Sequence, residues 1–255
     1  MDLARARILI TNDDGVHASG LKALERIARQ LSDDVWVVAP ATEQSAASHS
    51  LTIARPLRVR RNAERCYAVD GTPTDSVLIA VNQVMKERRP DLVLSGVNRG
   101  GNLGEDVTYS GTIAAAMEGT LLGIPSIALS QLAAIDAPTK WATAEYWAPG
   151  IIRTLVAATW PAGVLINLNF PDTPADAVKG VRVCAQGRRK LGSALIERHD
   201  PRGKPYYWID AARDEDATLA GTDLNAVSAG AVSVTPLFLD LTHRPTLQTL
   251  AGLFP

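Results

Sequence analysis

The chain has 255 residues, of which 46% are apolar and 21% charged, and its formal net charge is −1 at pH 7. This balance excludes a broad basic surface for nucleic acid and a polybasic membrane anchor, although one local pocket can still hold a small anion. The apolar content excludes wholesale disorder, and the length fits one large domain or one domain with an appendage.

The first elements alternate between apolar strands and an amphipathic helix. An apolar run over Arg7–Thr11 predicts a strand, because the turn residues Asn12–Gly15 follow it. A second buried strand is expected over Val35–Ala39, ended by Pro40. Between the two strands, apolar residues recur at helical spacing, at Leu21, Leu24, Ile27, Ala28 and Leu31.

The next segments predict a loop, a hairpin and a helix. Residues 41–50 are rich in Ser, Ala and Thr, which is typical of a loop, and residues 51–60 and 65–70 are expected to form the hairpin. Gly71–Asp75 predicts a turn into the helix, whose apolar positions are Val77, Leu78, Val81, Val84 and Met85.

Strand and helix continue to alternate beyond Pro90. A third core strand is predicted over Asp91–Ser95, followed by a Gly- and Asn-rich loop over Gly96–Tyr109 and a helix that Ser110 can cap. The remaining predicted elements are a strand over Ile124–Leu129, a helix at about 140–158, a strand over Val164–Phe170 and a late strand over Val232–Leu241.

This alternation predicts an α/β, Rossmann-like fold: a mostly parallel, doubly wound sheet with helices on both faces. The rhythm breaks after about residue 180, where Gly187–Arg213 is rich in charge, Pro and Tyr. We therefore expect a core over residues 1–185, a protruding arm over 186–213 and a C-terminal segment over 214–255. The arm's Tyr206-Tyr207-Trp208 cluster is too apolar for a free loop, so we expect a β-rich arm that packs on another subunit.

The cysteines and the apolar runs bear on the compartment. Cys66 and Cys184 are far apart in the sequence and form no CxxC, which argues against a disulfide framework and a thiolate zinc site. The apolar run Ile8–Ile10 is too short for a signal peptide, and no stretch reaches the roughly 18 apolar residues of a membrane span. The expectation is a soluble cytoplasmic protein with no membrane partner.

Polar side chains follow the first three core strands, where an open parallel sheet binds its ligands. Asp13-Asp14 is the sharpest signal. Successive strand residues point to opposite faces, so both carboxylates can serve one site only where the chain is turning, which Gly15 permits. Together with oxygen donors from Ser45 and Asn98, these acids suit Mg²⁺, Mn²⁺ or Ca²⁺ rather than Zn²⁺. The alternative is an Asx turn with a solvated helix start.

Tyr109–Thr112 opens a helix directly after the glycine-rich loop. The N–H groups of a helix N-terminus favour an anion, and the hydroxyls of Ser110 and Thr112 add donors; the alternative is an ordinary Ser N-cap. A metal and an anion site in one crevice together favour a phosphate ester. The sequence contains no GxGxxG, GxxxxGK[ST], GxSxG or HExxH motif, and the two acids are adjacent, unlike the DxD of covalent aspartyl-phosphatases.

These motifs, in this order, closely resemble the SurE family of survival-protein nucleotidases. The resemblance covers almost the whole chain and continues through the C-terminal third. It rests on Thr11–Gly15, Val38–Pro40 with Ser45, Gly71–Asp75, Ser95–Asn98 with Asn102–Gly104, Tyr109–Thr112, Asp200–Gly203, Tyr206–Trp208, Gly221–Asp223, Ser233–Leu237 and Asp240–Thr242.

The resemblance implies a metal-dependent phosphomonoesterase that hydrolyses nucleoside 5′-monophosphates, and also 3′-monophosphates, with short polyphosphate as a further substrate of some relatives. It implies one divalent cation per subunit, Mg²⁺ or Mn²⁺, with Ca²⁺ as a less active ion. It also implies homodimers or homotetramers that exchange C-terminal segments. The implied metal ligands are Asp13, Asp14, Ser45 and Asn98, and the implied phosphate-binding residues are Asn12, Ser110, Gly111 and Thr112.

The sequence offers no Ser or Cys nucleophile with a base oriented by a third group, so we expect direct attack by water associated with the cation. Asp13 or Asp14 would accept the proton of that water, and we favour Asp13. Two competing hypotheses are a nucleotide-binding regulator without turnover and a zinc deacetylase. The deacetylase would need a His just before the acidic pair, where Asn12 stands.

Overall fold

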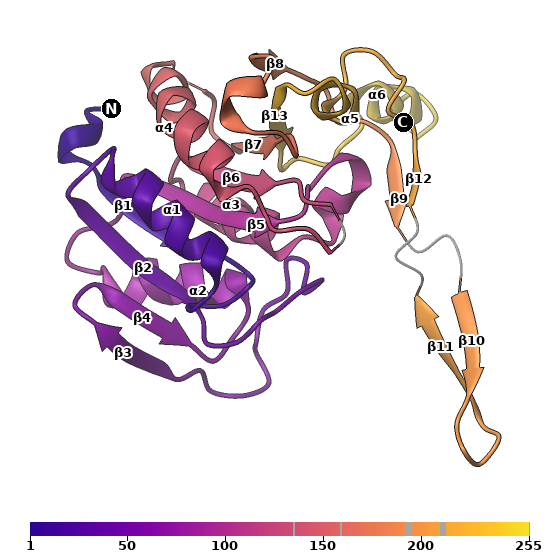
Figure 1. Ribbon diagram of the computed structural model, residues 1–255, viewed down its shortest axis with the longest axis horizontal. Helices are drawn as coiled ribbons and strands as arrows, with labels where there is room; N and C mark the ends of the chain where they lie inside the picture. The colour runs from indigo at the N-terminus through magenta and orange to yellow at the C-terminus, as the bar shows by residue number, and fades with distance from the viewer. Residues whose placement is uncertain (135, 159, 192–194, 210–212, 255) are drawn as a thin grey trace.

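The computed structural model describes residues 1–134, 136–158, 160–191, 195–209 and 213–254. Its centre is a nine-stranded sheet in the order β3-β4-β2-β1-β5-β6-β7-β13-β8 (Figure 1). The strands of this sheet are β1 (Arg7–Thr11), β2 (Asp34–Pro40), β3 (Val59–Ala63), β4 (Cys66–Val69), β5 (Leu92–Arg99), β6 (Ser126–Gln131), β7 (Val164–Phe170), β8 (Val181–Val183) and β13 (Val232–Phe238).

The central strands run parallel to one another, which confirms the predicted fold class. β1 pairs in parallel with both β2 and β5, and the parallel pairing continues through β6 to β7. Only β3 and β13 pair antiparallel within this sheet, with β4 and β7 respectively. The carboxyl ends of β1, β2 and β5 therefore lie side by side at one edge, which is where ligands bind in such sheets.

Helices cover both faces of the sheet because successive residues of β1 point to opposite sides. Ile8 and Ile10 pack on the face covered by α1 and α4, whereas Leu9 packs on the face covered by α2 and α3 (Figure 1). The helices are α1 (Ser19–Arg29), α2 (Pro73–Ile79), α3 (Gly111–Leu121), α4 (Trp141–Ala157), α5 (Asp223–Ser228) and α6 (Arg244–Ala251).

Two predicted boundaries are corrected by strand pairing. β5 continues beyond the predicted end at Ser95, because Asn98 and Arg99 pair with Ser130 and Gln131 of β6. The hairpin is shorter than predicted, since only Val59–Ala63 forms its first strand. The loop after β5 also contains a short 3-10 helix, η3 (Gly104–Thr108).

The predicted arm region forms a two-stranded antiparallel ribbon that extends away from the core (Figure 1). Residues 192–194 and 210–212, within the predicted arm, lie outside the described residues. No helix in the described part of the chain is long and apolar enough to cross a membrane, and both cysteines are free thiols. The four strands in and next to the predicted arm are β9 (Arg189–Leu191), β10 (Leu195–His199), β11 (Pro205–Ile209) and β12 (Arg213–Glu215).

Candidate functional site

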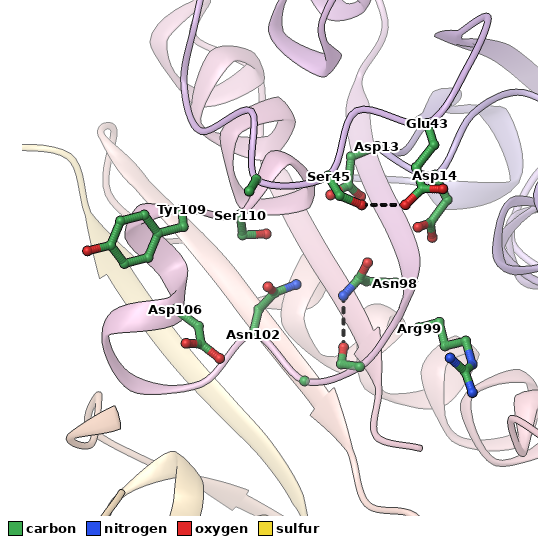
Figure 2. A pocket seen from close by; sticks show the side chains of 13 residues that line it. Asp13, Asp14, Glu43, Ser45, Asn98, Arg99, Asn102, Asp106, Tyr109 and Ser110 are labelled. Atoms are coloured by element: carbon green, nitrogen blue, oxygen red, sulfur yellow. Dashed lines mark hydrogen bonds between the residues drawn. The ribbon is translucent and has the colours of Figure 1, made fainter. Parts of the chain in front are cut away.

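A pocket of about 460 Å³ lies at the carboxyl ends of β1, β2 and β5 (Figure 2). Three loops and the start of α3 line it, as the alternation of strands and helices predicts. It brings together the four predicted metal ligands and one of the predicted phosphate-binding residues. The lining residues are Asp13, Asp14, Glu43, Ser45, Ala46, Asn98, Arg99, Gly100, Gly101, Asn102, Asp106, Tyr109 and Ser110.

The acidic pair lies in a tight turn after β1. Gly15 adopts a φ of 97°, a left-handed conformation that glycine tolerates, and the Asn12 Nδ2 donates to its carbonyl at 3.0 Å. The loop after β2 is joined to this turn, because the Gln44 N–H donates to the Asp13 carbonyl at 2.8 Å. These contacts place Asp13 and Asp14 beside Ser45, which comes from a different part of the chain.

The Asp13 side chain lies against the N-terminus of α3. Its Oδ1 accepts a hydrogen bond from the Thr112 hydroxyl at 2.5 Å. A β-carbon at Gly111 would lie 2.7 Å from the Asp13 Cβ, so only glycine allows this approach. The first turn of α3 therefore holds one of the two carboxylates in place.

Both carboxylates titrate above their ordinary range. Burial raises the pKa of Asp13, although hydrogen bonds from Thr112 oppose the shift. Burial, and then the negative charges of Asp13 and Glu43, raise the pKa of Asp14 from 3.8 to about 6. The pocket thus holds more negative charge than its own hydrogen bonds stabilise, and a bound cation would relieve this repulsion.

Ser45 and Asn98 complete a set of oxygen donors. The Ser45 Oγ donates to the Glu43 carboxylate at 2.7 Å, which leaves the lone pairs of the hydroxyl oxygen available. The Asn98 Nδ2 donates to the Gly100 carbonyl at 2.9 Å, and the amide oxygen points toward Asp14 and Ser45 (Figure 2). Carboxylate, hydroxyl and amide oxygens are the donors that Mg²⁺ and Ca²⁺ take in proteins.

The donor set fits a hard divalent cation and does not fit a zinc site. Among the described residues, no three His, Cys, Asp or Glu side chains gather closely enough to hold a metal without other ligands. A cation in this pocket would have to draw on Ser45 and Asn98 as well as on the acidic pair. That is the oxygen-rich composition expected from the sequence.

The predicted phosphate-binding residues are only partly in the pocket. Ser110 lines it and caps α3, because its Oγ accepts the Ile113 N–H at 3.1 Å. Asn12 and Thr112 are fully buried and do not line the pocket; Asn12 closes the turn after β1, and Thr112 binds Asp13. Gly111 is also buried, against Asp13.

Eight other lining residues were not among the predicted site residues, and four of them carry charged or aromatic side chains: Glu43, Arg99, Asp106 and Tyr109. Glu43 stands two residues before Ser45, and this spacing is the one sequence signal that could have pointed to it. Asp106 and Tyr109 lie in η3 and the residue after it, inside a segment that composition marks only as a loop. Their place in the pocket depends on how that segment folds back.

Comparisons with known proteins agree along the whole chain. A family model described as Survival protein SurE matches residues 8–193. A curated 5′-nucleotidase SurE from Paramagnetospirillum magneticum is 63% identical over 253 residues, covering 99% of this chain and 97% of that protein. Another, from Rhodospirillum rubrum, is 57% identical over 256 residues, covering 99% and 98%. The crystal structure of the SurE protein from Aquifex aeolicus superimposes with a TM-score of 0.86 at 40% identity, covering 98% of this chain and 100% of that chain.

Proposed function

The chain belongs to the survival protein SurE family, and on this premise we propose that it is a 5′-nucleotidase that hydrolyses nucleoside monophosphates to nucleoside and phosphate. The observation that carries the proposal is the convergence of Asp13, Asp14, Ser45 and Asn98 in one pocket with the start of α3. A pocket with cation ligands and an anion-binding helix terminus suits a phosphate monoester. Nucleoside 3′-monophosphates and short polyphosphate are further substrates within this proposal.

The proposed cation ligands are Asp13, Asp14, Ser45 and Asn98, with one Mg²⁺ or Mn²⁺ per subunit and Ca²⁺ as a less active ion. When bound there, the cation supplies positive charge that polarises the phosphoryl group and favours deprotonation of a nearby water. Glu43 supports the site by accepting a hydrogen bond from the Ser45 hydroxyl.

The proposed phosphate site is the N-terminus of α3. Ser110 uses its oxygen to accept the Ile113 N–H, so its own hydroxyl proton can be donated to a phosphoryl oxygen. Asn12, Gly111 and Thr112 are buried behind Ser110, and they support the turn after β1 and the start of α3 that form this side. Positive charge at the helix terminus stabilises negative charge as it moves toward the leaving oxygen.

The proposed nucleophile is water, since the pocket contains no Ser or Cys with a base and an orienting group. Ser45 is bound to Glu43 and Ser110 caps α3, so neither hydroxyl faces a His in the way that a catalytic triad requires. A carboxylate of the acidic pair takes the proton of the water as the water oxygen bonds to phosphorus, and this proton passes to the nucleoside oxygen as its bond to phosphorus breaks. We assign this role to Asp13, which lies against the start of α3 where the phosphate is expected.

We also propose a homodimer or homotetramer in which C-terminal segments are exchanged and residues 186–213 form an oligomerisation arm. Two features support it: α6 has no buried side chain, and the arm exposes Tyr207 and Trp208. The two free thiols fit a reducing compartment, so we place the enzyme in the cytoplasm.

Phosphate release from a panel of nucleoside 5′- and 3′-monophosphates tests the function. The purified full chain should release phosphate from the 5′-monophosphates, lose this activity in excess EDTA, and regain it with Mg²⁺ or Mn²⁺. A chain that binds nucleotides in this pocket without releasing phosphate, with any of the cations, would be a binding protein and not a nucleotidase.

A further inference from the structure

The base of the arm is joined to the turn that leads into α3. Arg189 is the first residue of β9, and its Nε lies 3.2 Å from the Asp106 Oδ2 and 3.3 Å from the Glu215 Oε2. The Arg189 backbone N–H also donates to the Glu105 carboxylate. A single residue of the arm thus contacts two consecutive acids of η3.

The contact is close as well as charged. Gly104, the first residue of η3, has a φ of +53°, and a β-carbon there would lie 2.8 Å from the Arg189 backbone nitrogen. A side chain at position 104 would therefore push β9 away from η3. The sequence keeps the two segments in direct backbone contact.

Asp106 belongs both to this contact and to the proposed active site. It lines the pocket together with Ser110 and the acidic pair, and its side chain is 9% exposed (Figure 2). Its backbone carbonyl accepts the N–H groups of Tyr109 at 3.0 Å and Ser110 at 3.1 Å. The position of Asp106 therefore sets the position of the residue that caps α3.

The charge of Asp106 creates an electrostatic problem for the proposed function. A phosphate monoester near Ser110 is an anion, and a nearly buried carboxylate lining the same pocket repels it. Removing the positively charged side chain that pairs with a buried carboxylate also strongly destabilises the folded state. The Arg189 guanidinium, 3.2 Å from Asp106 and 3.3 Å from Glu215, reduces both effects, since it places a positive charge beside the Asp106 carboxylate.

We propose that Arg189 is a positioning residue for phosphate binding: it pairs with Asp106 in the turn that presents Ser110, and its positive charge weakens the repulsion between the Asp106 carboxylate and the substrate. The inference rests on the proposed function, because it requires a phosphate group at the start of α3. It gives the base of the arm a role inside its own subunit, separate from any contact between subunits.

The test is a double-mutant cycle on inorganic phosphate binding, measured by isothermal titration calorimetry with the full chain and saturating Mg²⁺. Arg189→Met should weaken phosphate binding on the order of tenfold and raise KM for a nucleoside monophosphate more than it lowers kcat. Adding Asp106→Asn should restore most of the affinity, because the repelling charge is gone while the backbone carbonyl at position 106 still accepts the Tyr109 and Ser110 N–H groups. Arg198→Met removes a positive charge further along the arm, where Arg198 donates to the Glu197 carbonyl, and serves as the matched control.

Rescue by Asp106→Asn separates this role from a merely structural one, since a second substitution in a damaged fold would not restore binding. Arg189→Lys, which keeps the charge, should stay within about threefold of the unaltered protein and keeps the test usable if the Met variant does not fold. The proposal is overturned if Arg189→Met binds phosphate normally, or if the double variant binds as weakly as Arg189→Met alone. Failure of the unaltered protein to bind phosphate or to hydrolyse nucleotides would overturn the proposed function instead.

Discussion

At the scale of single residues, the proposed cation site depends on two neutral oxygen donors as much as on the acidic pair. Replacing Asn98 by Ala removes an amide oxygen that points toward Asp14 and Ser45. We expect Asn98→Ala to raise the dissociation constant for Mn²⁺ by at least about tenfold. Loss of a direct metal ligand should weaken binding at least as much as loss of a residue that only hydrogen-bonds a ligand. Titration followed by electron paramagnetic resonance measures this. Asn62→Ala, an exposed asparagine on β3, should leave Mn²⁺ affinity unchanged.

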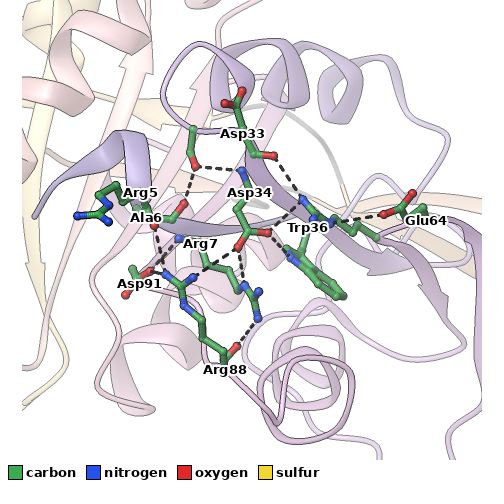
Figure 3. A network of polar contacts seen from close by, with 11 residues as sticks. Arg5, Ala6, Arg7, Asp33, Asp34, Trp36, Glu64, Arg88 and Asp91 are labelled. Atoms are coloured by element: carbon green, nitrogen blue, oxygen red, sulfur yellow. Dashed lines mark hydrogen bonds and ion pairs between the residues drawn. The ribbon is translucent and has the colours of Figure 1, made fainter.

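Asp34 shows how a charged residue stabilises the fold away from the pocket (Figure 3). Its carboxylate accepts hydrogen bonds from the Arg7 Nε and the Trp36 Nε1, both at 2.8 Å. Burial alone would raise the pKa of Asp34, but the hydrogen bonds from Arg7 and Trp36 and the charges of Arg7 and Arg65 outweigh it, so the pKa lies below 3.8. The folded state therefore favours the ionised form.

The sign of this shift fixes a pH dependence. A carboxyl with a lower pKa in the folded state adds stability above its unfolded pKa, and this stability is lost as the pH falls through the folded value. Asp34→Asn should lower the free energy of unfolding by about 1–2 kcal/mol at pH 7, and the difference should shrink below pH 3.8. Urea unfolding at both pH values checks this, with Asp33→Asn, an exposed neighbour, expected to change stability by less than about 0.5 kcal/mol. A deficit that persists unchanged at low pH would show that the charge is not the cause.

At the scale of elements, α2 is held by its cap. The Thr72 hydroxyl accepts the Asp75 N–H at 3.1 Å, and the Asp75 carboxylate accepts the Thr72 N–H at 2.8 Å, a reciprocal capping box. Thr72→Val keeps the shape but removes the cap and the hydrogen bond that the hydroxyl donates to the Ser50 carbonyl at 2.8 Å, so it should cost at least about 1 kcal/mol of unfolding free energy. The matched control is Thr154→Val on the exposed side of α4, where the hydroxyl donates back to the Gly150 carbonyl of the same helix. Equal effects of the two substitutions in urea unfolding would refute the capping argument.

The sequence predicts the elements well where burial alone defines them, and less well where pairing or packing decides. A continuous apolar run locates β1, because Ile8 and Ile10 face one layer of helices and Leu9 faces the other, so all three are buried. The same reasoning predicts that β5 ends at Ser95, since the Gly and Asn residues that follow are weak strand formers. The pairing of Asn98 and Arg99 with β6 overrides that preference, and no local signal reveals it.

The same division holds for the pocket. Asp13, Asp14, Ser45 and Asn98 were predicted to converge because they follow adjacent strands, and they do line one pocket. Residue type alone could not show that the Thr112 hydroxyl is taken up by Asp13. It also could not place Asp106 in the pocket, because that depends on contacts between η3 and the arm.

At the scale of the whole molecule, the arm carries apolar surface that a single chain leaves in solvent. Tyr207 is 58% exposed and Trp208 63% exposed on β11, in a ribbon that projects from the core (Figure 1). The double substitution Tyr207→Ser/Trp208→Ser should shift the proposed oligomer toward smaller species in multi-angle light scattering, because aromatic side chains contribute strongly to interfaces. Lys204→Ser at the tip of the same ribbon should leave the mass unchanged. An unaltered mass for the aromatic variant would refute the assignment of this arm to oligomerisation.

The central claim is that the pocket built on Asp13 and Asp14 hydrolyses nucleotides with a divalent cation. The most direct measurement is the turnover of a nucleoside 5′-monophosphate by Asp13→Asn/Asp14→Asn in saturating Mg²⁺ or Mn²⁺, alongside the unaltered protein. Both substitutions are isosteric and lie in a turn, so the melting temperature should change little. We predict that kcat falls at least about 100-fold, because the cation contributes several kcal/mol and each 1.36 kcal/mol is tenfold in rate. A folded double variant that turns over at near the original rate would contradict this account of the site.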